Sequence, residues 1–395
     1  MPILLISIIL IILSLGVCFG YTTVNVDDYG AIPNDIKEDN EAFQKAWNEA
    51  CSKGAVLVVP KNGIYRLKPI TFSGPCKPNT AFMVYGTVKA WPRPSAYKKD
   101  PTHWIRFNGI SGLRVGGGGI GIINGNGKKW WKKSCKVNKT LPCTDAPTAV
   151  TFYQCNNLSV TKLSFLNSQK MHLSIENCVN ARLSGLYVIA PEHSPNTDGI
   201  HVTSSRNVDI SHTYIGTGDD CISIESGSSN VKVQDITCGP GHGISIGSLG
   251  DSNSRAEVSN VVVDRAKLIG TTNGVRIKTY QGGSGYARFI EFKNIEMRNV
   301  SNPIIIDQNY CDQQEPCPEQ KSAVEISNLV YHHITGTSAS EVAINFDCSK
   351  TVPCRNVHVE NVTLEAEGGG QTIASCANVV NASSLFPQCQ SQGHQ

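Results

Sequence analysis

Three short stretches of the sequence place polar residues where they could carry out acid–base chemistry. Two adjacent carboxylates, Asp219 and Asp220, precede an alternating apolar run in a chain where only 17% of the residues are charged. Asp198 and His242 begin two similar runs, DGIHV and HGISI. Carboxylates that lie close together repel each other, which raises the pKa of at least one of them. Such clusters are usually catalytic or bind a metal ion.

The spacing of these runs indicates how they could come together. Four pentapeptides superimpose and begin 22, 22 and 31 residues apart: DGIHV (198–202), DCISI (220–224), HGISI (242–246) and NGVRI (273–277). A second series, Asn before alternating aliphatic residues, begins at 156, 206, 229, 259, 327 and 355. The recurring Asn suits a left-handed turn position, where its side chain can bond locally. Short β-branched strands at this period, without a long helical pattern, predict an all-β solenoid of parallel strands. A β-sandwich is the competing interpretation, but its hairpin signals are lacking.

The register of this solenoid predicts where each side chain points. Four aliphatic residues should stack inside: Ile200, Ile222, Ile244 and Val275. Asp198, Asp220 and His242 should stack on consecutive coils, roughly 4.7–4.9 Å apart. A second row contains His201, Ser223, Ser245 and Arg276. Parity places Asp219, Arg276 and Lys278 on the outer surface, while Gly and Pro bends before the strands turn the other acids toward the same groove.

The charges around this cluster favour a negatively charged ligand. A Ca²⁺ site would need more oxygen ligands than three carboxylates supply, and the cations Arg276 and Lys278 argue against any metal. The stretch 127–136, GKKWWKKSCK, interleaves lysines with tryptophans. This pattern suits a polyanion, either nucleic acid or an acidic polysaccharide, or a plain loop whose tryptophans pack on the core. The formal net charge of +3 does not decide between these partners.

The two ends of the chain predict an exported protein with a capped solenoid. Residues 1–20 form an uncharged apolar run before Gly20, which we interpret as a cleaved secretory signal, with an uncleaved anchor as the alternative. No other stretch could span a membrane. Residues 39–53 have helical periodicity and should cover the open end of the solenoid.

The cysteines and glycosylation motifs fit the same compartment. Loss of the leader leaves 14 cysteines, an even number that favours disulfides over metal ligation. The pairs closest in sequence are Cys221/Cys238, Cys311/Cys317, Cys348/Cys354 and Cys376/Cys389. Five N-glycosylation motifs are present, at Asn138, Asn157, Asn299, Asn361 and Asn381.

Four blocks of the sequence resemble the signature motifs of the polygalacturonases, glycoside hydrolase family 28. The blocks are SPNTDGIH (194–201), GTGDDCISI (216–224), CGPGHGISIGSLG (238–250) and NGVRIKTY (273–280). The resemblance implies a single catalytic domain over residues 21–395, folded as a right-handed parallel β-helix. It also implies metal-free, inverting hydrolysis of α-1,4-galacturonosyl bonds in pectin by a monomeric, extracellular cell-wall enzyme.

The resemblance also implies a role for each site residue. Asp219 would protonate the glycosidic oxygen, Asp198 and Asp220 would activate the attacking water, and His242 would tune the protonation of the acid. The substrate carboxylate would bind at Arg276 and Lys278, supported by Asn196 and by the cleft tyrosine Tyr310.

The mode of action remains open between several alternatives. Segments 238–250, 302–311 and 346–362 look most like the pollen-type exopolygalacturonases, which favours attack from the chain end. Residues 309–322 and 91–104 could supply the loops that block the groove. The alternatives are endo attack, a pectate lyase and a non-catalytic pectin-binding solenoid.

Overall fold

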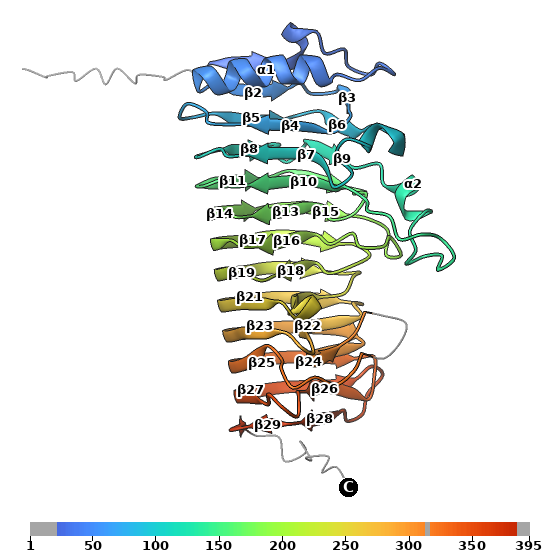
Figure 1. Ribbon diagram of the computed structural model, residues 1–395, viewed down its shortest axis with the longest axis vertical. Coiled ribbons are helices and arrows are strands. Elements are labelled where there is room, and N and C mark those ends of the chain that lie inside the picture. Colours follow the sequence, from blue (N-terminus) through green and yellow to red (C-terminus); the bar gives the residue numbers. More distant parts are fainter. Residues whose placement is uncertain (1–21, 313–316, 385–395) are drawn as a thin grey trace, which may run out of the picture.

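The protein is a parallel β-helix, as the repeats predicted (Figure 1). A computed structural model describes residues 22–312 and 317–384. The proposed leader, residues 1–20, lies outside the described residues. Among the described residues, no helix is long and apolar enough to cross a membrane.

Two sheets of parallel strands run along the length of the β-helix. The eleven-stranded sheet consists of β4 (Ile70–Ser73), β7 (His103–Asn108), β10 (Thr148–Tyr153), β13 (Leu173–Glu176), β16 (Ile200–Thr203), β18 (Ile222–Ile224), β20 (Ile244–Leu249), β22 (Asn273–Tyr280), β24 (Asn302–Tyr310), β26 (Val342–Asp347) and β28 (Ile373–Ala377).

The nineteen-stranded sheet forms the rest of the wall. It consists of β1 (Thr23–Asn25), β2 (Val56–Val59), β3 (Ile64–Leu67), β5 (Ala81–Val84), β6 (Thr87–Ala90), β8 (Arg114–Gly116), β9 (Ile122–Asn124), β11 (Leu158–Thr161), β12 (Ser164–Leu166), β14 (Val179–Ser184), β15 (Tyr187–Ile189), β17 (Arg206–Gly216), β19 (Ser228–Cys238), β21 (Arg255–Ile269), β23 (Ser284–Val300), β25 (Glu325–Ser338), β27 (Cys354–Ala366), β29 (Val379–Val380) and β30 (Ser383–Ser384).

The predicted register of the central coils is confirmed. Ile200 pairs with Ile222, Ile222 with Ile244, and Ile244 with Val275, and all four side chains are fully buried. Alternate residues of these strands therefore face outward. Because the inward positions are aliphatic on every coil, the polar row beginning at His201 lies on the outer face of the sheet.

The recurrent asparagines also behave as predicted. Each asparagine of the second series has a left-handed backbone, with φ between 53° and 57°: Asn157, Asn207, Asn230, Asn260, Asn328 and Asn356. Their amides bond from coil to coil, as where Asn230 donates to Asn207 over 3.0 Å and Asn207 donates to Asn180 over 2.9 Å. The side chain thus compensates for a backbone conformation that most residues avoid.

The predicted capping helix is α1 (Asn40–Lys53), which lies across the N-terminal end of the stack (Figure 1). Its inner face buries Phe43 and Trp47, and Trp47 packs on Phe72 with ring centroids 5.3 Å apart. The disulfide Cys51–Cys76 ties the helix to the first coils. The cap covers apolar side chains that would otherwise be exposed at the open end.

Three of the four predicted disulfides are confirmed: Cys221–Cys238, Cys311–Cys317 and Cys348–Cys354. The fourth cannot be described, because Cys389 lies outside the described residues. Two further disulfides, Cys51–Cys76 and Cys135–Cys143, were not predicted. Cys155 and Cys178 are buried free thiols, so the even number of cysteines does not mean that all of them pair.

Candidate active site

The acidic residues gather on the outer face of the eleven-stranded sheet, where loops enter its central strands. Asp198 precedes β16, Asp219 and Asp220 precede β18, and His242 precedes β20. The predicted bends are present, because Gly239 and Gly241 have φ of 146° and 148°. At Gly218 a Cβ atom would lie 2.1 Å from the main-chain oxygen of Ser194. The tight turn therefore lets both members of the acid pair face one side.

Asp220 is the most deeply buried acid of the cluster, with a side chain 1% exposed. Its Oδ1 accepts hydrogen bonds from the Ser245 hydroxyl (2.8 Å) and the Arg276 guanidinium (3.0 Å). Its Oδ2 accepts from Lys278 Nζ over 3.0 Å. Two cations thus balance one buried carboxylate. Without them, burying this charge would be costly.

This pairing corrects one expectation about the cations. Arg276 and Lys278 were predicted on the outer surface, but their side chains are only 14% and 10% exposed. Both do lie on the outward face of the sheet, as parity required. Their charged ends turn toward Asp220 and bond to it, so they hold the site together as well as facing the groove.

Asp219 and His242 form a second pair. His242 Nδ1 lies 3.1 Å from Asp219 Oδ1, and the Asn196 amide lies 3.5 Å from Oδ2. Burial raises the pKa of Asp219, but the hydrogen bond and charge of His242 outweigh burial and leave that pKa below its ordinary value. The same hydrogen bond raises the pKa of His242. The pair therefore favours a proton on the imidazole beside an ionised carboxylate.

Asp198 lies next to Asp219 and Asp220 and is buried, with 7% of its surface exposed. Its Oδ2 accepts a hydrogen bond from the Ser223 hydroxyl over 3.0 Å. Burial, followed by the charges of Asp219 and Asp220, raises the pKa of Asp198 well above its ordinary value. Crowding of the three acids thus raises the pKa of Asp198. It does not raise the pKa of Asp219, as the assignment of Asp219 as general acid would suggest.

Tyr310, at the end of β24, stands beside the cations as predicted for a cleft tyrosine. Lys278 Nζ lies 5.4 Å from the centroid of its ring, and Tyr280 packs edge-on against the ring at 5.1 Å. Burial raises the pKa of Tyr310 to about 12. Tyr310 is thus a neutral aromatic surface next to Lys278.

A cleft of about 580 Å³ lies on the other side of the acids and reaches Asn196. Its lining includes Trp131, Lys133 and Lys170. Within the lysine–tryptophan stretch, α2 (Lys128–Trp131) anchors Trp131, whose indole N–H donates to the Ser168 carbonyl over 3.0 Å. The tryptophans are thus partly structural, while the lysines stay exposed beside a cleft that leads to the acids.

The arrangement fits acid–base chemistry better than metal binding. Ligand atoms of Asp219, Asp220 and His242 lie within 4.8 Å of one another, a spacing that could hold a cation. Arg276 and Lys278, however, occupy both oxygens of Asp220 at 3.0 Å. A divalent cation would have to displace or approach these positive charges. The site instead offers one proton-bearing pair, one carboxyl of raised pKa and one carboxylate held by cations.

All the predicted site residues lie in or beside this groove, but the roles of the serines were not predicted. Ser223 bonds to Asp198, and Ser245 bonds to Asp220. The register had placed both in one outward row with His201 and Arg276. The signal was therefore present in the alignment of coils, but a serine at an outward position is ordinary and did not indicate a function.

Sequence comparison identifies the family of the chain. Residues 51–385 match the profile described as "Glycosyl hydrolases family 28". The chain belongs to this family. The family 28 relatives include the polygalacturonase of Persea americana, 56% identical over 91% of this chain and 77% of that protein. Polygalacturonase-2 of Solanum lycopersicum is 54% identical over 94% of this chain and 82% of that protein. The resemblance stated from the four sequence blocks is thus confirmed at the level of the family.

Solved structures confirm the family 28 fold. The endo-xylogalacturonan hydrolase of Aspergillus tubingensis superimposes with a TM-score of 0.79 at 22% identity, covering 92% of this chain and 99% of that chain. An exopolygalacturonase from Thermotoga maritima superimposes with a TM-score of 0.77 at 20% identity, covering 91% and 90%. The two neighbours differ in mode of attack, so the shared fold does not distinguish exo from endo action.

Proposed function

We propose that this protein hydrolyses α-1,4-galacturonosyl bonds in pectin, with inversion, and acts from a chain end. One observation carries the hydrolytic part: three carboxylates and a histidine meet on one face beside two cations. A pair of carboxyl groups that can act as acid and base is what glycoside hydrolysis requires. The cations supply attraction for a uronate. Sequence similarity to plant polygalacturonases supports the same substrate.

In this mechanism the Asp219–His242 pair supplies the proton. The resting proton lies on His242 next to Asp219, and Asp219 passes it to the glycosidic oxygen as that bond breaks. Because the pKa of Asp219 is low, it is a strong acid once protonated. Since the pKa of His242 is raised, the pair keeps its proton below that pKa and loses it as the pH rises through it.

Asp198 and Asp220 orient and deprotonate the attacking water. A raised pKa makes Asp198 a stronger base than an ordinary aspartate while it is still ionised. Activity should therefore fall on the acidic side as the pH drops through the pKa of Asp198, above the ordinary range of an aspartate. Asn196 and Tyr310 flank the reacting sugar, and Arg276 and Lys278 attract its carboxylate.

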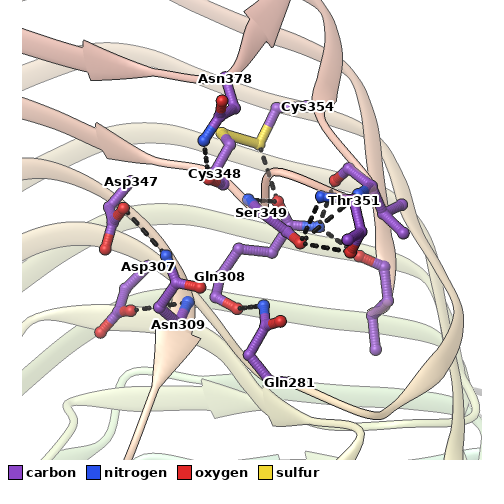
Figure 2. Close-up of a disulfide and its surroundings, with 12 residues drawn as sticks. Gln281, Asp307, Gln308, Asn309, Asp347, Cys348, Ser349, Thr351, Cys354 and Asn378 are labelled. Carbon is purple, nitrogen blue, oxygen red and sulfur yellow. Dashed lines mark hydrogen bonds between the residues drawn. A yellow bond between two sulfur atoms is a disulfide. The ribbon is translucent and has the colours of Figure 1, made fainter. Parts of the chain in front are cut away.

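Chain-end attack is supported by two acids, Asp307 and Asp347, on the coils that follow Lys278. In register, Lys278 is followed by Asp307 and then Asp347 on the same outward face. Figure 2 shows both acids joined through Asn309, which donates to Asp347 over 2.9 Å. Burial, followed by the charge of Asp347, raises the pKa of Asp307 to about 6. Above the pKa of Asp307, a polyuronate would meet negative charge directly beyond Lys278.

The wall next to these acids is firmly held. The disulfide Cys348–Cys354 closes a loop whose Ser349 N–H donates to the Gln308 side chain over 2.8 Å (Figure 2). Gln308 is fully buried. Thr351 donates to the Gln320 carbonyl over 3.2 Å, which links this loop to residues 317–322. These contacts support the expectation that the long connection between β24 and β25 limits the groove.

A bridge between the two rims also supports restricted access. Lys136 lies on the loop that leads into β10, and Asp312 follows β24, so the two stand on opposite sides of the sheet face. Lys136 Nζ lies 2.7 Å from both carboxylate oxygens of Asp312. Each residue is next to a disulfide, Cys135–Cys143 or Cys311–Cys317, which restrains the backbone beside it. A long chain would enter a bridged groove more easily by its end.

The products formed over time test the proposed function. With de-esterified polygalacturonate we expect saturated monogalacturonate from the first minutes, while the viscosity of the substrate falls slowly. Mixed oligomers with a rapid loss of viscosity would contradict chain-end attack. Unsaturated products, abolished by a chelator, would indicate a lyase, and binding without products would indicate a non-catalytic solenoid.

Charge reversal at the bridge provides a matched test of access. Lys136→Glu should increase mid-chain cleavage, seen as a larger viscosity loss per reducing end, and Lys136→Glu with Asp312→Lys should restore the original ratio. Exposed ion pairs contribute roughly 0.2–1 kcal/mol, so we expect a change of at most about fivefold. The same shift should appear in the unaltered protein at high salt. A double variant that behaves like the single one would contradict the role of this pair.

The place of action is also part of the proposal. The five glycosylation motifs, the disulfides and the apolar leader agree with an extracellular, cell-wall location. We infer that a pectic polysaccharide in the cell wall is the physiological substrate.

A further inference from the structure

A chain of hydrogen bonds leads from Asp198 to a histidine that the proposed mechanism does not use. The Ser223 hydroxyl donates to Asp198 Oδ2 over 3.0 Å. His201 Nδ1 lies 2.8 Å from the same hydroxyl oxygen. His201 and Ser223 are register partners on β16 and β18, so their side chains emerge next to each other from the outward face.

A second chain with the same layout lies one coil further on. Arg276 Nε donates to the Ser245 hydroxyl over 3.1 Å, and Ser245 donates to Asp220 Oδ1 over 2.8 Å. Asp220 also accepts hydrogen bonds directly from Arg276 and Lys278. Each of the two acids assigned to water activation thus has a serine that connects it to a nitrogen donor. The difference is that the donor for Asp220 is a cation and the donor for Asp198 is an imidazole.

The direction of the first chain follows from counting protons. A serine hydroxyl has one proton, which Ser223 donates in its hydrogen bond to the ionised Asp198. The serine oxygen can therefore only accept the hydrogen bond from His201. Burial, followed by the charges of Lys170 and Lys278, lowers the pKa of His201 to about 4. His201 is therefore neutral, and its single N–H lies on Nδ1 when Asp198 is ionised.

We propose that His201 is a positioning residue that acts through the Ser223 hydroxyl to hold Oδ2 of Asp198 as a proton acceptor. This inference rests on the proposed function, which assigns the attacking water to Asp198. A chain of donors stabilises the ionised form of a carboxyl group more than its protonated form. The chain thus counteracts the burial and like charges that act on Asp198, and it fixes the oxygen that faces the donor.

Several other groups face Asp198 and His201 and must stay constant in any test. They come from the loops before β13, β18 and β20 and from β22: Lys170, His172, Asp219, Asp220, His242 and Lys278. Ser223→Ala and His201→Leu leave all of these in place. A shift common to both variants therefore reports on the chain itself.

The pH dependence of kcat/KM on polygalacturonate tests this inference. Ser223→Ala and His201→Leu should move the acidic limb to higher pH by about one unit, because a hydrogen bond to a charged group contributes roughly 1.5–3 kcal/mol. KM at the optimum should change little. His201→Asn should restore the original limb, since an asparagine N–H can take the place of Nδ1. Ser174→Ala is the control, because Ser174 aligns with His201 one coil earlier but donates to Glu176.

Three results would overturn the inference. The acidic limb could be unmoved in folded Ser223→Ala and His201→Leu, it could move to lower pH, or His201→Leu could change KM alone. The last result would make His201 a direct substrate contact. The pKa of Asp198, measured by ¹³C NMR on aspartate-labelled protein, should rise in Ser223→Ala and provides a readout that does not depend on turnover. An inactive unaltered protein would refute the proposed function, whereas an unmoved Asp198 pKa refutes only this inference.

Discussion

Asp219→Asn is expected to lower kcat on polygalacturonate by at least about 10³-fold, at the upper part of the range for loss of a general acid. The side chain keeps its size, and the Asn196 amide and His242 remain beside it. What disappears is the carboxyl group that takes the proton from His242 and gives it to the leaving oxygen. Because the glycosidic oxygen is a poor leaving group without a proton, bond cleavage should become limiting. Initial rates of reducing-end release measure this effect.

A matched control separates loss of the acid from general damage. Asp235→Asn removes a partly exposed carboxylate that pairs with Arg265 at 2.7 Å, on the nineteen-stranded sheet and away from the groove. Its activity should equal that of the unaltered protein. Both variants should keep the same far-ultraviolet circular dichroism and melting temperature within a few degrees. Turnover by Asp219→Asn above a tenth of the original would rule out Asp219 as the acid.

The coil register was predictable because it follows from a short local pattern. The equivalent positions of Ile200, Ile222, Ile244 and Val275 could be aligned by eye, and stacking of Asp198, Asp220 and His242 follows once the strands are parallel. The position-specific asparagines were also readable, since a left-handed residue has few alternatives. The four family motifs lie on the same coils as these stacked residues.

Contacts between distant loops were not predictable, because they depend on how far each loop folds over the sheet. Lys136 and Asp312 are 176 residues apart and meet across the groove. The disulfides Cys51–Cys76 and Cys135–Cys143 depend on the positions of a helix and a loop. Cys155 and Cys178 stack at equivalent positions of adjacent coils and remain thiols.

The burial of the cations was missed for a different reason. Alternation within a strand places a side chain on the outer or inner face, but it does not say how high the neighbouring loops rise. Arg276 and Lys278 are outward by parity and yet nearly covered. Their long side chains turn toward the buried Asp220 because opposite charges attract. The periodicity of the sequence does not contain this information. This difference changes what their substitution should do.

Lys278→Met is expected to lower both stability and turnover, and not only substrate affinity. The substitution keeps an unbranched side chain but leaves Asp220 Oδ2 without its cation at 3.0 Å in a site only 1% exposed. Breaking a buried ion pair typically costs about 3–5 kcal/mol. Because Arg276 and Ser245 still bind Oδ1, we expect roughly half of that cost, about 2 kcal/mol, measured by urea unfolding. For kcat/KM on de-esterified substrate we expect a loss of about 10²-fold.

The double variant Asp220→Asn with Lys278→Met distinguishes the two roles of this lysine. Replacing the carboxylate by an amide removes the charge that Oδ2 no longer shares with a cation, but Arg276, whose side chain is 14% exposed, then loses its counter-charge. The free energy of unfolding should therefore recover only in part. Activity should not recover, because the substrate carboxylate has lost a cation and the attacking water has lost a carboxylate. If Lys278→Met instead raises KM while kcat and stability stay unchanged, Lys278 only binds substrate. In that case its contact with Asp220 contributes nothing to the arrangement of the acids.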